Sequence, residues 1–137
     1  MANRTGRAQS THDGVIAAAG EIYRRANKAV WLNPGSEKNK PWSGQYIDII
    51  VAANRNRHDA VWVIEVETDD SVSELEAKDE WTGYATAFSN WCLAVQEGSE
   101  EKARALLDEL QISNCAVITW QNTADGKYAF SGLPGLT

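Results

Sequence analysis

A stretch of ten residues, VWVIEVETDD from Val61 to Asp70, constrains this chain more than any other feature. Its first half is rich in β-branched residues and predicts a buried strand, yet it carries Glu65 and Glu67. A spacing of two places both carboxylates on one face of the strand, about 7 Å apart. At an effective dielectric near 20, two such charges repel by about 2 kcal/mol. The fold must therefore offer these carboxylates a basic partner, water or a cation.

The hydrophobic pattern of the rest of the chain predicts an α/β protein with a mixed sheet flanked by helices. Length and an apolar content of 43% fit one domain over residues 11–137, preceded by a flexible tail over residues 1–10. Apolar stripes of helical period predict helices over 13–28, 73–90 and 99–110. Short apolar runs predict strands over 30–32, 46–53, 61–67, 91–95, 116–120 and 128–130. A hairpin region followed by strand–helix–strand crossovers implies the mixed sheet.

Three acidic residues lie inside predicted strands: Asp48, Glu65 and Glu67. If the strands over 46–53 and 61–67 pair so that their acidic faces coincide, the three carboxylates converge. Mg²⁺ or Mn²⁺ would relieve their repulsion, because hard divalent cations prefer oxygen ligands. Alternatively, Asp48 caps a turn, and the two glutamates face solvent beside basic side chains.

The charge is unevenly distributed along the chain. Residues 1–60 hold nine basic and five acidic groups, and residues 61–137 hold four basic and fourteen acidic groups. The N-terminal basic residues are either a solvated surface or a face that contacts DNA phosphates. The chain has no predicted signal peptide or membrane span. Its two cysteines lie in apolar runs, so we expect reduced, buried thiols and a cytoplasmic protein.

The acidic motif resembles that of the PD-(D/E)XK nuclease superfamily. The resemblance rests on Asp48 in QYIDIIVA, on Glu65-Val66-Glu67 in VWVIEVETDDSV, and on the helix predicted next; it covers about residues 12–120. It implies a restriction-endonuclease-like fold, with an αβββαβ core and here an extra αβ unit. It also implies Asp48, Glu65 and the Val66 carbonyl as ligands of Mg²⁺ or Mn²⁺, DNA as substrate, and a homodimer.

Glu67 occupies the third motif position, where the superfamily usually has lysine and some restriction enzymes have glutamate. Glu67 can act as a base or an extra ligand but cannot supply positive charge. Lys78, on the following helix, is a candidate replacement for the lysine, although an i,i+4 ion pair with Glu74 is the favoured interpretation. Some members of the superfamily carry a glutamate near the metal on their first helix. Glu21 is the candidate here, but its place opposite the apolar stripe argues against that role.

Two functions remain open from the sequence: a metal-dependent nuclease, with Asp48, Glu65, Glu67 and Lys78 as candidate catalytic residues, and an inactive nuclease-fold module that binds nucleic acid or a protein. A third interpretation is an unrelated α/β domain with a chance motif. Several polar and aromatic residues are assigned ordinary roles. His12 and His58 are predicted at the surface and Ser71 in a helix lead, while Trp42 either stacks on a base or folds back on the core.

Overall fold

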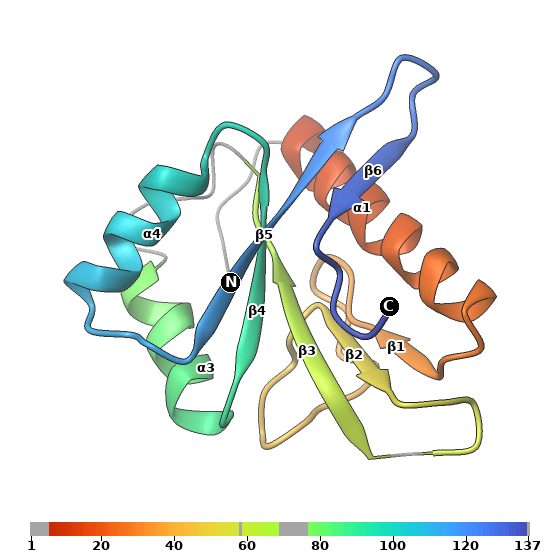
Figure 1. The fold of residues 1–137 in the computed structure, drawn as a ribbon, viewed down its shortest axis with the longest axis horizontal. Coiled ribbons are helices and arrows are strands. Elements are labelled where there is room, and N and C mark those ends of the chain that lie inside the picture. The colour runs from red at the N-terminus through yellow and green to blue at the C-terminus, as the bar shows by residue number, and fades with distance from the viewer. Residues whose placement is uncertain (1–5, 58, 69–76, 137) are drawn as a thin grey trace.

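A six-stranded mixed sheet forms the centre of the chain in the computed structural model, which describes residues 6–57, 59–68 and 77–136 (Figure 1). The strands follow one another across the sheet in sequence order. The pairs β1–β2, β2–β3 and β5–β6 are antiparallel, and β3–β4 and β4–β5 are parallel. The strands are β1 (Val30–Leu32), β2 (Ile49–Ala52), β3 (Ala60–Val66), β4 (Trp91–Gln96), β5 (Cys115–Asn122) and β6 (Tyr128–Ser131).

Helices cover both faces of this sheet. The helix α1 (Gly6–Arg25) lies on one face, and α3 (Thr82–Ala87) and α4 (Glu100–Glu109) lie on the other (Figure 1). A π-helical turn, η2 (Ala77–Trp81), leads directly into α3. None of the described helices has the length and apolar character that crossing a membrane requires.

Alternation of side chains along the strands gives each face its own hydrophobic core. The core on the α1 side contains Ile49, Ile64 and Val66 together with the apolar stripe of α1. The core on the α3 and α4 side contains Ile50, Val63 and an aromatic group. In that group the Trp81 and Trp91 ring centroids are 6.5 Å apart. The predicted α/β class with a mixed sheet is therefore confirmed.

Several predicted boundaries differ from the structure. The strand predicted over 46–53 is shorter, Ile49–Ala52, because the Ile47 and Asp48 carbonyls accept hydrogen bonds from Asn33 and are tied to the preceding loop. The helix predicted from residue 13 begins at Gly6, so residues 6–10, predicted as part of a flexible tail, are helical. The helix predicted over 73–90 is described from Ala77 as η2 and α3, and its predicted start and Ser71 lie outside the described residues.

Candidate metal and substrate site

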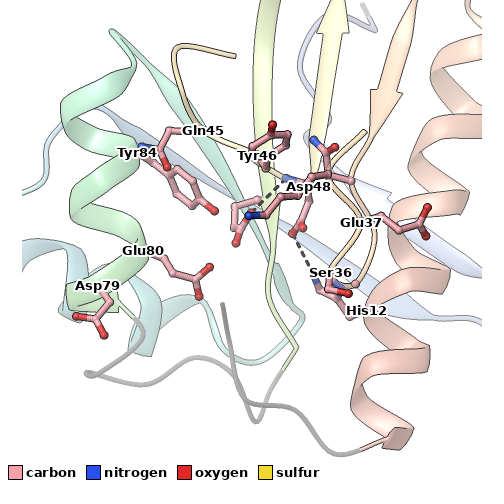
Figure 2. Close-up of a pocket in the computed structure, with 13 residues that line it drawn as sticks. His12, Ser36, Glu37, Gln45, Tyr46, Asp48, Asp79, Glu80 and Tyr84 are labelled. Carbon is pink, nitrogen blue, oxygen red and sulfur yellow. Dashed lines mark hydrogen bonds and ion pairs between the residues drawn. The ribbon is translucent and has the colours of Figure 1, made fainter. Parts of the chain in front are cut away.

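A pocket of about 270 Å³ opens at the carboxyl end of β3, between α1 on one side and η2 with α3 on the other (Figure 2). Asp48 and Glu65 line its inner part. Glu80 and Tyr84 come from η2 and α3 on one side, and His12 comes from α1 on the other. Asp79 of η2 also lines the pocket, and the loop between β1 and β2 supplies the remaining lining residues: Asn33, Gly35, Ser36, Glu37, Lys38, Gln45 and Tyr46.

Strand register brings Asp48 and Glu65 together, as the sequence predicts. Ile49 pairs with Ile64, so one further step along the antiparallel ladder places Asp48 opposite Glu65. Asp48 Oδ2 accepts a hydrogen bond of 2.8 Å from the Val66 backbone N–H, and Glu65 Oε1 accepts one of 3.3 Å from the Asp48 backbone N–H. Both carboxylates are buried, with 6% and 3% of their residue surface exposed.

Three glutamates form the acidic cluster of the site: Glu65, Glu67 and Glu80. One carboxylate oxygen from each lies within 4.8 Å of the others. Glu67 is fully buried, and its Oε1 accepts a hydrogen bond of 3.4 Å from Trp81 Nε1. Its backbone carbonyl accepts a bond of 2.9 Å from Trp120 Nε1, which fixes the end of β3. Two charges 4.8 Å apart repel by roughly 3 kcal/mol at a dielectric near 20, so the cluster favours protons or a cation.

The protonation of Glu65 reflects this repulsion. Burial raises the pKa of Glu65 well above its ordinary value, and the nearby carboxylates of Asp48, Glu67 and Glu80 raise it further. Burial and the Glu65 charge likewise raise the pKa of Tyr84, which keeps its hydroxyl neutral and able to donate a hydrogen bond to Glu65. The site therefore favours the protonated form of Glu65 more than water does, and burial is the larger cause.

The acidic cluster has the donor set that Mg²⁺ or Mn²⁺ requires. All three ligands are carboxylate oxygens, which hard divalent cations prefer. Two oxygens on opposite sides of such a cation, each about 2.0–2.6 Å from it, are about 4–5 Å apart. The separation within the cluster is of that size, so small side-chain movements could bring all three oxygens onto one cation, with water filling the other positions.

The prediction that His12 lies at the surface is wrong, because the structure buries it. Only 2% of its surface is exposed, and its Nε2 lies 3.0 Å from Asp48 Oδ2. Its Nδ1 lies 3.1 Å from Asp13 Oδ1, which also accepts hydrogen bonds from Gln9 Nε2 and the Gly35 N–H. If both aspartates are ionised, His12 can donate to both of them only as an imidazolium ring, because a carboxylate only accepts.

The structure brings some of the predicted site residues together and leaves the roles of others untested. Asp48 and Glu65 meet in the pocket, and Glu67 belongs to the acidic cluster, whereas Asp48 is not one of the three cluster ligands. Val66 contributes its N–H to Asp48, and ligation by its carbonyl stays a prediction. The Lys78 side chain lies outside the described part of the chain, so its role also stays a prediction.

Sequence reasoning missed Glu80, Tyr84 and His12. Glu80 and Tyr84 are four residues apart and therefore share a helix face with the apolar stripe that contains Phe88. A charged residue at an inward-facing helical position was the signal for Glu80. His12 lies one turn before Ile16 and extends the buried stripe of α1. Both positions could have been identified from the 3.6-residue period.

Other residues from the sequence have ordinary roles. Glu21 is exposed and pairs with Arg25 at 3.0 Å, as its place opposite the apolar stripe predicts. Trp42 is half-buried against the core beside α3, which favours the folded-back alternative over base stacking. Cys92 is buried and free, and Cys115 is half-buried and free. His58 lies outside the described residues.

Two of the N-terminal basic residues in the described part of the chain, Lys38 and Arg55, lie in separate regions. Lys38 lines the pocket, whereas Arg55 lies in the turn before β3, at the opposite end of that strand from Glu65. The Arg55 N–H donates to the Asn27 carbonyl, so this turn contacts the end of α1. Seven residues of β3 span about 20 Å, which separates the two regions.

Comparison of the chain with protein-family models, with curated proteins and with solved structures gives no match.

Proposed function

We propose that this chain is a divalent-cation-dependent phosphodiesterase that acts on DNA. The observation that carries the proposal is the acidic cluster beside the pocket, in which carboxylate oxygens of the buried Glu65 and Glu67 and the half-buried Glu80 lie within 4.8 Å of one another. Such a cluster destabilises the fold unless protons or a cation neutralise it. Its position next to an open pocket therefore favours a functional role over a structural one.

The order of elements supports a restriction-endonuclease-like fold, and with it the nuclease proposal. A helix, three antiparallel strands, a helix and a parallel strand follow one another as α1, β1–β3, α3 and β4, and α4 with β5 forms the extra unit. This is the order that the resemblance to PD-(D/E)XK nucleases implies. The acidic motif also lies at the carboxyl end of a strand with a parallel neighbour, where open α/β sheets commonly bind ligands.

Each residue of the site has a part in the proposed reaction. Glu65, Glu67 and Glu80 would hold Mg²⁺ or Mn²⁺, and the cation would supply positive charge to a phosphate and lower the pKa of a water molecule. Tyr84 orients Glu65 through its hydroxyl. Asp48 fixes the end of β3 through Val66 and is itself held by His12. Lys38 is the lysine among the described pocket residues and can approach a phosphate.

One observation favours the second candidate, an inactive nuclease-fold module. Asp48, a metal ligand by the resemblance, instead uses its Oδ2 for contacts with His12 Nε2 and the Val66 N–H. Glu67 also occupies the position where the motif usually has lysine. In this alternative the pocket binds nucleic acid or a protein partner without hydrolysis.

Titration calorimetry with Mg²⁺ and with Mn²⁺ tests the proposal. We expect the wild type to bind at least one of the two cations, and we expect Glu80→Gln to weaken binding by tenfold or more, because it removes a charged ligand. Glu101→Gln is the matched control, since Glu101 is an exposed glutamate on α4. Binding should strengthen as pH rises, because protons on Glu65 compete with the cation and its pKa is raised.

Incubation with single-stranded, linear and plasmid DNA separates the two candidates. Cleavage that requires the cation and is lost in Glu80→Gln supports the enzyme. Cation binding with every DNA form left intact supports the inactive module. If neither cation binds the wild type at any pH between 6 and 9, the metal-dependent proposal is wrong.

A further inference from the structure

The Tyr46 ring is an exposed aromatic surface at the mouth of the pocket. With 42% of its surface exposed, it is one of two large apolar residues that the described chain leaves open to solvent, and Leu136 is the other. Tyr46 lines the same pocket as Glu65 and Glu80 (Figure 2). An exposed aromatic ring beside a polar pocket is a common feature of binding sites, because it offers a large contact area at a small cost in conformational entropy.

Lys38 lies against this ring. Its Nζ is 5.6 Å from the centroid of Tyr46, and both residues line the pocket. We refer to these two side chains as the Tyr46–Lys38 platform. Two similar pairs, Lys28 with Trp62 and Lys40 with Trp31, have comparable distances of 5.6 and 5.4 Å, but none of their residues lines the pocket. The platform therefore combines a stacking surface with a positive charge at the rim of an acidic site.

A buried asparagine holds both parts of the platform in place. Asn33, with 2% of its surface exposed, donates through Nδ2 to the carbonyls of Lys40 and Ile47 at 2.8 Å each. Its Oδ1 accepts bonds from the N–H groups of Asn39 and Lys40 at 2.8 and 2.9 Å. The backbone on the C-terminal side of Tyr46 and of Lys38 is thus fixed before any ligand arrives, which reduces the entropy lost on binding.

We propose that the Tyr46–Lys38 platform binds an unpaired nucleotide, so that the substrate strand is single-stranded where it enters the pocket. The base stacks on the Tyr46 ring, and Lys38 pairs with a phosphate of the same strand as it passes toward the acidic cluster. This inference rests on the proposed function and specifies its substrate.

Pocket size and depth favour a single strand over a duplex. A volume of about 270 Å³ is slightly below the usual range for a ligand site, so the pocket is too small for a base pair. Glu65 and Glu67 of the cluster are buried and Glu80 is half-buried, whereas the backbone of a duplex is held rigidly at its surface. A base within a duplex is also stacked on its neighbours, so its face is not available to Tyr46 without unpairing. An unpaired base stacks on an aromatic ring with little sequence preference.

Fluorescence anisotropy with a labelled 12-nucleotide DNA strand of mixed sequence tests the inference. The measurement uses the full chain with Ca²⁺, a cation that takes oxygen ligands, and compares this strand with its duplex. We expect the single strand to bind more tightly than the duplex, and Tyr46→Ala to weaken single-strand binding by about tenfold, which is typical for the loss of one stacked base. Tyr46→Phe should bind as the wild type does, because it keeps the ring.

A matched pair of lysine variants tests whether position matters. Lys38→Gln and Lys28→Gln each remove one charge and one lysine–aromatic contact at the same distance of 5.6 Å, but only Lys38 lines the pocket. We expect Lys38→Gln to weaken single-strand binding severalfold and Lys28→Gln to leave it within twofold. Equal losses in the two variants would mean that the contact is general charge attraction, and the inference would be wrong.

The outcomes distinguish failure of this inference from failure of the proposed function. If Tyr46→Ala binds the strand as the wild type does, or if the duplex binds as tightly as the single strand, the platform has no such role, while cation binding by calorimetry and DNA cleavage still decide the enzyme. If strand binding depends on Tyr46 but no cation binds the acidic cluster, the platform stands and the metal-dependent enzyme does not. Circular dichroism confirms that each variant is folded.

Discussion

Replacing Glu65 with glutamine should stabilise the cation-free protein at pH 8 and abolish its response to Mg²⁺ or Mn²⁺. The wild type buries an ionisable carboxyl among the carboxylates of Asp48, Glu67 and Glu80, and its pKa is raised for that reason. Glutamine keeps an acceptor for the Asp48 N–H and gives its neighbours an amide donor. We expect a gain of about 2 kcal/mol in the free energy of unfolding, or roughly 5–8 °C in Tm.

The pH dependence of the same variant follows from the direction of the shift. A raised pKa means that the folded protein binds the Glu65 proton more tightly than the unfolded chain does. The stabilisation from that proton is complete below the ordinary value of 4.5 and is lost as pH rises toward the raised pKa. The wild type should therefore lose stability over this range relative to Glu65→Gln, and the two curves should approach each other at low pH.

Addition of the cation should reverse the order of stability. A ligand at about 100 times its Kd stabilises the folded wild type by about 2.7 kcal/mol, whereas Glu65→Gln has lost a ligand and should gain little. Thermal unfolding followed by circular dichroism, with and without the cation, measures both effects, and Glu101→Gln should behave as the wild type does. If Glu65→Gln is less stable than the wild type without cation at pH 8, the buried Glu65 carboxylate does not destabilise the cation-free protein, and this prediction is wrong.

The strands were predictable because each is a short apolar run with clear ends. The strand predicted over 61–67 corresponds to β3, Ala60–Val66, and the strand predicted over 91–95 corresponds to β4, Trp91–Gln96. The strand around Asp48 was predicted too long, because an apolar run does not reveal that Asn33 binds its first carbonyls. Apolar periodicity also placed the start of α1 too late, since its first turns are polar on most sides.

The acidic site was only partly predictable for a related reason. Spacing within one strand places Glu65 and Glu67 on a common face, and antiparallel pairing adds Asp48. Glu80 and His12 arrive from helices on opposite faces of the sheet, and a single sequence does not give the depth to which each helix inserts. The helical period predicts that both side chains point toward the sheet, but it does not predict which residues they contact there.

His12→Ala should cause the largest loss of stability among the variants considered, about 3–5 kcal/mol in the free energy of unfolding. The imidazole ring is buried between Asp48 at 3.0 Å and Asp13 at 3.1 Å. Removing His12 leaves the buried Asp48 carboxylate without this partner, and an uncompensated buried charge costs far more than the net value of a pair. Ser10→Ala, an exposed change on the same helix, should alter stability by less than about 0.5 kcal/mol.

A double-mutant cycle with Asp48→Asn measures how much of the stabilisation by His12 comes from its contact with Asp48. If His12 neutralises Asp48, His12→Ala should cost much less in the Asp48→Asn background, because no buried charge is left behind, and the coupling should be about 1–3 kcal/mol. Chemical denaturation at pH 7 measures the four free energies. Additive losses would instead assign the effect of His12 to packing or to Asp13.

Cation binding by the same variants decides between the two roles of Asp48. If Asp48 is a metal ligand, as the resemblance implies, Asp48→Asn should weaken cation binding by tenfold or more, while His12→Ala should leave it intact or strengthen it by releasing Oδ2. If Asp48 only fixes the end of β3 through the Val66 N–H, the asparagine variant should bind the cation almost as the wild type does, because Glu65, Glu67 and Glu80 remain. The His12–Asp48 contact would then have a structural role, and the acidic cluster would bind the cation without Asp48.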